Sequence, residues 1–281
     1  MIYIVTALPW EARPIIDRYN LKREGDPRYF PVFSGNDMRL IVSGVGKIAS
    51  SIAATYLLAG EETGQDTAIV NIGLCGAVNQ EHPIGTSVLV NKIVDHETGN
   101  EYYPDILLKH PFIEGSIETH SRVVRRENVD GGQTRILADY VDMEASGFYQ
   151  AAVRFLSPHQ IYVIKIISDY LDVKDFHKDR VTGWIARAVD DIYGFLEQVR
   201  MFCKSNEPVF SEAEQCYLEN IKERLRLTVT QGHQLVDLAR KYKIRTGKPL
   251  PDFSDVIGIE VKVKAEGRKA FEGIKRILTA E

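Results

Sequence analysis

The chain has 281 residues, 44% hydrophobic and 26% charged, which is typical of one large globular domain or of a domain with an accessory segment. The formal net charge of −4 gives no general attraction for nucleic acid, and no apolar run approaches the roughly 18–20 residues of a membrane span. We therefore expect no nucleic-acid partner and no membrane association. The three cysteines lack metal-type spacing and the N-terminus lacks a signal-peptide pattern, which predicts a cytoplasmic protein without disulfides or a cysteine zinc site.

The first predicted element is a buried strand over residues 2–7, a short apolar run with β-branched residues. Leu8-Pro9-Trp10-Glu11 then forms a turn that begins a helix. Glu11 therefore leaves the carboxyl end of the first strand. Taken alone, it is better explained as a first-turn acid that complements the helix dipole.

Residues 29–33 and 38–43 are predicted strands joined by a hairpin turn. The second strand leads through Ser43-Gly44-Val45-Gly46-Lys47 into a helix rich in small residues. Glycines at such a turn allow close backbone approach, and the helix N-terminus favours an anionic or polar ligand. The pattern is not a dinucleotide fingerprint, because the third glycine and the following acidic partner are missing.

A third buried strand begins at Ala68 and is expected to end in a glycine-rich loop over residues 73–76. Strand continues over residues 86–90 and 93–96, whereas the polar residues 99–118 are expected to form a long loop over the site. Residues 121–139 are charged, and Gly131-Gly132 marks a loop within them. The last core strand, residues 162–169, places Asp169 at its carboxyl end, and residues 184–201 have helical apolar spacing.

Residues 140–152 join a strand end to a helix, and Glu144 stands at that junction. A carboxylate there lies where open α/β sheets place their ligands, although a helix-dipole acid explains it equally well. After residue 205 the character changes: residues 211–242 predict one or two amphipathic helices with a capping box at Ser211, and Phe271, Ile274 and Ile277 predict a closing helix. We see no catalytic motif in this tail.

Four apolar strands thus deliver Glu11, the Gly44–Gly46 turn, the residue 73–76 segment and Asp169 to one edge. Together with Met143-Glu144 and Ser168-Asp169, this ordered set resembles the purine and uridine phosphorylase superfamily, and within it the 5′-methylthioadenosine/S-adenosylhomocysteine nucleosidases. The resemblance covers roughly residues 1–200. It implies a three-layer αβα sandwich with a mixed central sheet over residues 1–205, and it leaves residues 206–281 as a helical C-terminal extension.

The resemblance also implies roles for individual residues. Met143 would back the ribose and Glu144 would accept bonds from its hydroxyls. Asp169 would be the general acid that protonates the purine at N7, oriented by Ser168, which requires a site that keeps its carboxyl protonated. Glu11 would hold and deprotonate the attacking water, while Gly76 and Lys165 would complete the substrate-binding set.

Water is the expected nucleophile rather than phosphate. The phosphorylases carry an arginine where Asn71 stands, and a small hydroxyl residue where Leu74 stands. Glu11 would also repel a phosphate dianion. We therefore expect hydrolysis of the N-glycosidic bond of a purine nucleoside, without metal or organic cofactor, by a homodimer of the kind the family often forms.

Several departures leave alternatives open. Leu74-Cys75-Gly76-Ala77 replaces the nucleosidases' Ser-Ala-Gly-Gly, and Lys165 replaces their usual arginine. The base-stacking segment before Met143 has no match in residues 118–124, so the base and the 5′ group stay open, a futalosine-like nucleoside included. His120 is expected to be a solvated surface residue, and His96 has no better support as a contact. A phosphorylase and a non-catalytic nucleoside-binding homologue are the remaining alternatives.

Overall fold

The computed structural model describes residues 1–25, 29–59, 66–172, 177–205, 210–254 and 264–279. The chain forms two compact units, Met1–Ser205 and Asn206–Glu281, which are described separately.

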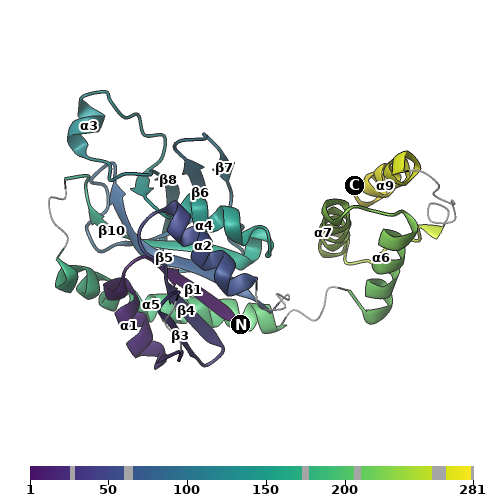
Figure 1. Cartoon of the computed structure of the whole chain (residues 1–281), viewed down its shortest axis with the longest axis horizontal. Coiled ribbons are helices and arrows are strands. Elements are labelled where there is room, and N and C mark those ends of the chain that lie inside the picture. Colours follow the sequence, from purple (N-terminus) through teal and green to yellow (C-terminus); the bar gives the residue numbers. More distant parts are fainter. Residues whose placement is uncertain (26–28, 60–65, 173–176, 206–209, 255–263, 280–281) are drawn as a thin grey trace. The chain divides into compact units, whose positions relative to one another are not determined.

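Four strands of the first unit run parallel in the order β4 (Met38–Val42), β1 (Ile2–Thr6), β5 (Ala68–Ala77) and β10 (Ile161–Asp169). Their carboxyl ends therefore meet at one edge, as the sequence predicted (Figure 1). The other strands of this sheet are β2 (Lys22–Arg23), β3 (Val32–Gly35), β6 (Ser87–Asp95), β7 (Glu101–Tyr102), β8 (Ile113–Thr119) and β9 (Tyr140–Asp142).

The sheet is mixed, which confirms the prediction. Strand β3 runs antiparallel to β4, β9 antiparallel to β5, and β6 antiparallel to β10, whereas β8 runs parallel to both β6 and β9. Because β5 also pairs with β10, the strands β10, β6, β8, β9 and β5 close into a ring. This closure joins strands far apart in sequence, and no local pattern of residues predicted it.

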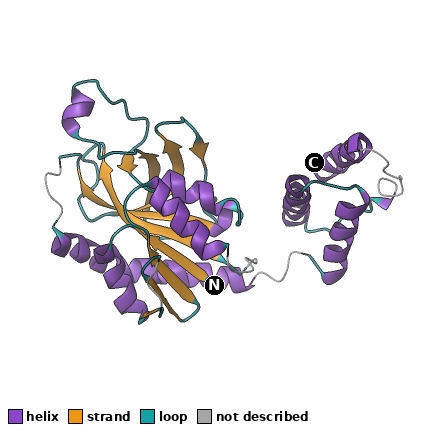
Figure 2. Cartoon of the chain, in the orientation of Figure 1, coloured by secondary structure: helices purple, strands orange, loops and turns teal. Residues whose placement is uncertain are grey.

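Helices cover both faces of the sheet (Figure 2). The side chains of Ile2 and Ile4 pack with α1 (Pro9–Tyr19) and α5 (Lys178–Ser205), whereas those of Tyr3 and Val5 pack with α2 (Lys47–Leu58) and α4 (Ala145–Ala152). This alternation follows from the two-residue period of a strand. The three-layer arrangement agrees with the expectation. The shorter helical elements are α3 (Arg126–Asp130) and the 3₁₀ turn Pro158–Gln160.

Two loop predictions were wrong. Residues 73–76 lie inside β5, which continues to Ala77, and β7 and β8 occupy part of the expected loop over residues 99–118. No described residue of that segment lines the pocket described below. The error over β8 has a physical reason: its last two residues, Glu118 and Thr119, are polar yet buried, so the apolar alternation that marks a strand is missing. The loop expected at Gly131-Gly132 follows directly after α3.

A glycine sets the close approach of α2 and α4. A Cβ on Gly147 would lie 2.1 Å from the backbone oxygen of Lys47, which has no freedom to move aside. We expect Gly147→Ala to lower the free energy of unfolding by about 1–3 kcal/mol. Gly194→Ala in α5, where an added Cβ would meet nothing within 4 Å, should raise it by about 0.5–1 kcal/mol.

Urea denaturation followed by tryptophan fluorescence measures both variants, because Trp10 and Trp184 both lie in the first unit. Equal midpoints for the two alanine variants would contradict the steric reason given for Gly147.

The second unit contains α6 (Glu212–Arg224), α7 (Val229–Thr246) and α9 (Lys264–Thr279) around its own apolar core. The capping box is confirmed: Glu214 N–H donates to Ser211 Oγ at 3.3 Å, and Ser211 N–H donates to the Glu214 carboxylate at 2.9 Å. Phe271 and Ile274 are buried as predicted, but Ile277 is 42% exposed and Leu278 is buried instead. In neither unit is a described helix both long and apolar enough to cross a membrane.

Candidate active site

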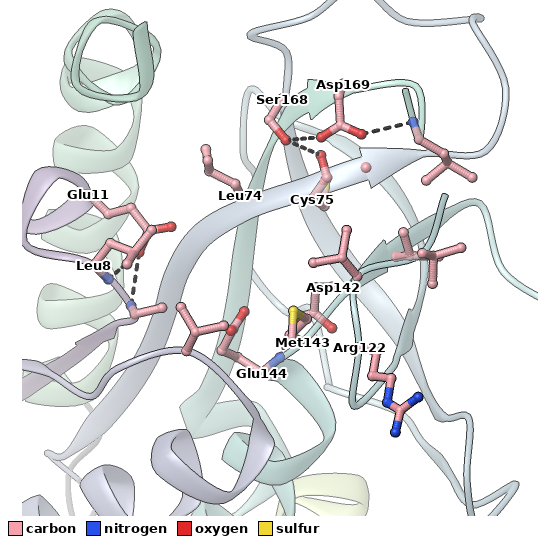
Figure 3. Close-up of a pocket in the computed structure, with 17 residues that line it drawn as sticks. Leu8, Glu11, Leu74, Cys75, Arg122, Asp142, Met143, Glu144, Ser168 and Asp169 are labelled. Carbon is pink, nitrogen blue, oxygen red and sulfur yellow. Dashed lines mark hydrogen bonds between the residues drawn. The ribbon is translucent and has the colours of Figure 1, made fainter. Parts of the chain in front are cut away.

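A pocket of about 260 Å³ opens where β1, β5 and β10 end. It contains the three carboxylates predicted from the sequence, Glu11, Glu144 and Asp169, which approach it from three sides (Figure 3). Three of the other predicted site residues also line it, namely Gly76, Met143 and Ser168. The remaining lining residues are Ala7, Leu8, Val45, Leu74, Cys75, Arg122, Val123, Val124, Val141, Asp142 and Leu171.

Glu11 lies in the first turn of α1, shortly after the end of β1. The backbone N–H groups of Ala7 and Leu8 donate to its Oε2 at 2.9 and 2.8 Å. Its side chain is buried, and burial together with the nearby charge of Glu144 raises the pKa of Glu11 to about 7. A Cβ on Gly73 would lie 3.3 Å from Glu11 Oε1, so the glycine leaves room for this carboxylate. Glu11 is thus a fixed acid poised to exchange a proton near neutral pH.

Glu144 occupies the N-cap position of α4, and its Oε1 accepts the backbone N–H of Gly46 at 3.0 Å. Gly44 and Gly46 have φ values of +85° and +106°, conformations that favour glycine. The sequence predicted that the Gly44–Gly46 turn would favour an anionic or polar ligand. In the structure, the Gly46 N–H donates to the carboxylate of Glu144, a side chain of the protein itself. Burial raises the pKa of Glu144, although the ammonium of Lys165 opposes the shift.

Asp169 ends β10 beside Gly76 of β5, where a Cβ would lie 3.1 Å from Asp169 Oδ1. Oδ1 accepts the N–H of Leu171 at 2.8 Å, and Leu171 adopts the left-handed conformation with φ +66°. Ser168 Oγ lies 2.5 Å from Asp169 Oδ2 and 3.1 Å from the carbonyl oxygen of Cys75. Burial raises the pKa of Asp169, which favours its protonated form. The left-handed backbone of Leu171 is strained for a residue other than glycine, and such strain often occurs at functional sites.

Lys165 of β10 is buried and is not among the described residues that line the pocket. Its ammonium, 1% exposed, lies 2.9 Å from Asp142 Oδ2 and 3.5 Å from Glu144 Oε2. These carboxylates and Glu11 raise the pKa of Lys165, against the effect of its burial. Lys165 therefore contacts the acids of the site, whereas the sequence predicted that it would contact the substrate.

Sequence reasoning missed Asp142 and one wall of the pocket. Asp142 Oδ2 accepts the N–H of Ala145 at 2.8 Å, and its Oδ1 accepts the Thr119 hydroxyl at 2.7 Å. An aspartate that separates a strand from a helix start is a usable sequence signal for such a role. The wall comprises Arg122, Val123 and Val124, for which the sequence offered only an uncertain alignment. His120, predicted to be solvated, is 5% exposed.

Residues 1–126 match the family model described as the phosphorylase superfamily, which confirms the resemblance found in the sequence. The fold is similar to that of the 5′-methylthioadenosine/S-adenosylhomocysteine nucleosidase of Helicobacter pylori, with 16% identity, a TM-score of 0.59, and coverage of 70% of this chain and 97% of that one. The corresponding enzyme of S. pneumoniae has 20% identity and a TM-score of 0.56, with coverage of 69% and 97%. A mutant futalosine hydrolase of Helicobacter pylori has 16% identity and a TM-score of 0.57, with coverage of 70% and 98%. At these identities the likeness establishes the fold.

Proposed function

We propose that this chain, which shares the fold of those nucleosidases, hydrolyses the N-glycosidic bond of a purine nucleoside. The observation that carries the proposal is the convergence of Glu11, Glu144 and Asp169 on one pocket, each with a raised pKa. Hydrolysis of a glycosidic bond needs a protonated acid near the leaving group and a base near the water, and paired carboxylates supply both.

Asp169 is proposed as the general acid. Its raised pKa favours the proton that the reaction must deliver to N7 of the base, so that the base leaves as a neutral molecule. Ser168 Oγ donates its proton to Asp169 Oδ2, and the Leu171 N–H donates to Oδ1. These two contacts orient the carboxyl without taking up its own proton, which stays available for the base.

Glu144 and Met143 are proposed to bind the ribose. Glu144 Oε2 accepts hydrogen bonds from the ribose hydroxyls, while Oε1 keeps its hydrogen bond from the Gly46 N–H. As the C–N bond breaks, its electron pair leaves with the base and positive charge develops on the sugar. The carboxylates of Glu144 and Glu11 stabilise that charge. Water then bonds to the anomeric carbon and gives its proton to Glu11, so the products are the free base and a free sugar.

Lys165 is proposed as a positioning residue rather than a substrate ligand. Its ammonium sits between Asp142 and Glu144 and offsets part of their negative charge in a buried site. Gly76 is proposed to admit the base, because its missing side chain keeps the space beside Asp169 open.

The charges around the pocket favour water over phosphate as the nucleophile. Lys165 is paired with carboxylates, and Asn71, at the position of the phosphorylases' arginine, donates to the carbonyl oxygen of Val5 at 3.1 Å. Arg122 also lines the pocket, but its guanidinium points away from Glu11 and Asp169 (Figure 3). Arg122 is the one cationic side chain among the described residues that line the pocket, and the ionised carboxylates of Glu11 and Glu144 that the proposed mechanism uses would repel a phosphate dianion.

A panel of purine nucleosides, incubated with purified protein in the presence and absence of phosphate, tests this proposal. We expect release of free base at a rate that does not depend on phosphate, with free sugar as the second product. Release of ribose 1-phosphate would instead establish a phosphorylase. Nucleoside binding without any release of base would establish a binding protein.

The substrate we propose is a nucleoside of the methylthioadenosine or adenosylhomocysteine type. A futalosine-like substrate is the alternative within the same panel, since one protein of similar fold is a futalosine hydrolase. We also propose a homodimer in the cytoplasm, by analogy with the family that the sequence resembles.

A further inference from the structure

Two histidines and a glutamate gather where β6 and β8 end. The two strands run parallel, with Asp95 opposite Thr119, and His96 N–H donates to the Thr119 carbonyl oxygen at 3.0 Å. Glu118 and His120 are two residues apart, so their side chains share one face of the extended chain. None of the three residues His96, Glu118 and His120, the HEH cluster, lines the pocket described above.

The ligand atoms of the HEH cluster converge. Glu118 Oε1 lies 2.7 Å from His96 Nδ1 and 3.2 Å from His120 Nε2, and all the ligand atoms lie within 4.8 Å of one another. The two imidazole rings stack with their centroids 4.0 Å apart. Glu118 Oε2 accepts the backbone N–H of Leu137 at 2.6 Å, which turns Oε1 toward the histidines.

His120 is the member of the HEH cluster whose ring nitrogen Nε2 is buried without a hydrogen-bond partner. It is 5% exposed, and its Nε2 makes no hydrogen bond of acceptable geometry, although Glu118 Oε1 is near. A neutral imidazole offers a metal ion the lone pair of one ring nitrogen. An unsatisfied buried nitrogen is costly, and a cation bound to it and to the Glu118 carboxylate, which is 2% exposed, would remove that cost.

We propose that His96 Nδ1, Glu118 Oε1 and His120 Nε2 bind a divalent transition-metal ion, with Zn²⁺ the best match and water as the fourth ligand. Zn²⁺ binds histidine nitrogen and carboxylate oxygen at about 2.0–2.2 Å, and tetrahedral geometry then separates the ligand atoms by about 3.3–3.5 Å. The 3.2 Å between His120 and Glu118 already matches that separation. His96, whose side chain is 38% exposed, has room to withdraw from Glu118 by the remaining fraction of an ångström and to leave the fourth position open to water.

The ion would stabilise the fold where β6 and β8 end, and would thereby hold the adjoining wall of the pocket in place. It would tie the end of β6 to the end of β8, from which the chain continues through Ser121 into the wall formed by Arg122, Val123 and Val124. Thr119, between two of the ligands, donates to Asp142, which pairs with Lys165. This site is thus a structural metal centre next to the proposed catalytic centre, and the chemistry of hydrolysis does not pass through it.

The test is a Zn²⁺ titration of chelator-treated full-length protein in competition with a chromogenic chelator. The protein carries Cys203→Ser and Cys216→Ser so that neither the exposed thiol of Cys216 nor the thiol of Cys203 contributes. We expect one equivalent of Zn²⁺ to bind, and we expect His120→Ala, Glu118→Gln and His96→Ala each to weaken binding at least tenfold. Co²⁺ should give a visible absorption band that the same three variants lose.

His110→Ala is the matched control, because His110 Nε2 also lies beside a glutamate, 3.4 Å from Glu114, but among the described residues no third ligand joins this pair. It should bind Zn²⁺ like the parent protein. His96→Ala keeps the test valid if the buried variants fail to fold, since His96 is the exposed member of the cluster. Zinc should raise the Tm of the parent and of His110→Ala but not that of His96→Ala. Unchanged zinc affinity in His96→Ala, or no binding by the parent protein, would overturn the proposal.

Discussion

Asp169→Asn is expected to lower kcat by about 10²–10⁴-fold, the contribution typical of a general acid, while nucleoside affinity changes little. An asparagine preserves the shape and can still accept the Leu171 N–H that Asp169 Oδ1 accepts at 2.8 Å, but it cannot deliver a proton to the leaving base. Steady-state kinetics give kcat, and equilibrium binding of a non-hydrolysable nucleoside analogue gives the affinity.

The pH dependence provides a second readout for the same residue. Because Asp169 must be protonated to act and burial raises its pKa, activity should fall as pH rises through that raised value, and the variant should lose this limb. Asp190→Asn, an exposed aspartate paired with Arg18, is the matched control and should leave kcat unchanged. Full activity in Asp169→Asn would refute the assignment of the acid.

Glu11→Gln is expected to lower kcat by a similar factor, about 10²–10⁴-fold, because glutamine cannot accept the proton of the attacking water. The base must be ionised, so kcat/KM in the parent enzyme should rise with pH through about 7, the pKa to which burial and Glu144 raise this carboxyl. The variant should lose that rise. Rates measured across pH 5–9 with a single nucleoside test both statements.

The same carboxyl links stability to pH. Its pKa is raised from 4.5 to about 7 on folding, so its contribution to stability is complete below pH 4.5 and is lost as pH rises through about 7. Glu11→Gln should therefore flatten the decline in Tm between pH 5 and 8. Glu24→Gln, at an ion pair with Arg39 away from the pocket, should leave both the rate and this decline unchanged. A parent-like pH profile in Glu11→Gln would remove the role of Glu11 as base.

The sequence predicted the fold and the site best where the pattern lay in residues next to one another along the chain. Apolar runs identify β1, β5 and β10, and because parallel strands align their carboxyl ends, the sequence alone predicts Glu11 and Asp169 at one edge of the sheet. The pocket-lining position of Glu144 followed from its place between a strand and a helix.

The predictions that failed concern side chains whose contacts are with residues far away in the sequence. Strand β8 carries buried polar residues because Thr119 and Glu118 find partners in Asp142 and in the backbone N–H of Leu137. His120 is buried against His96, 24 residues earlier, so nothing next to it in the sequence indicated its environment. The pairing of Lys165 with Asp142 likewise appears only once β9 and β10 are placed together.

The ring of strands has a consequence for how copies of this protein can associate. Once β5 pairs with β10, the outermost strands of the described sheet are β2 and β7, each of two residues, and β2 presents the exposed, charged Lys22 and Arg23. Short and charged edges resist the addition of a strand from another molecule. The fold is thereby protected against open-ended aggregation through its sheet, and a specific assembly would have to form through helices or loops.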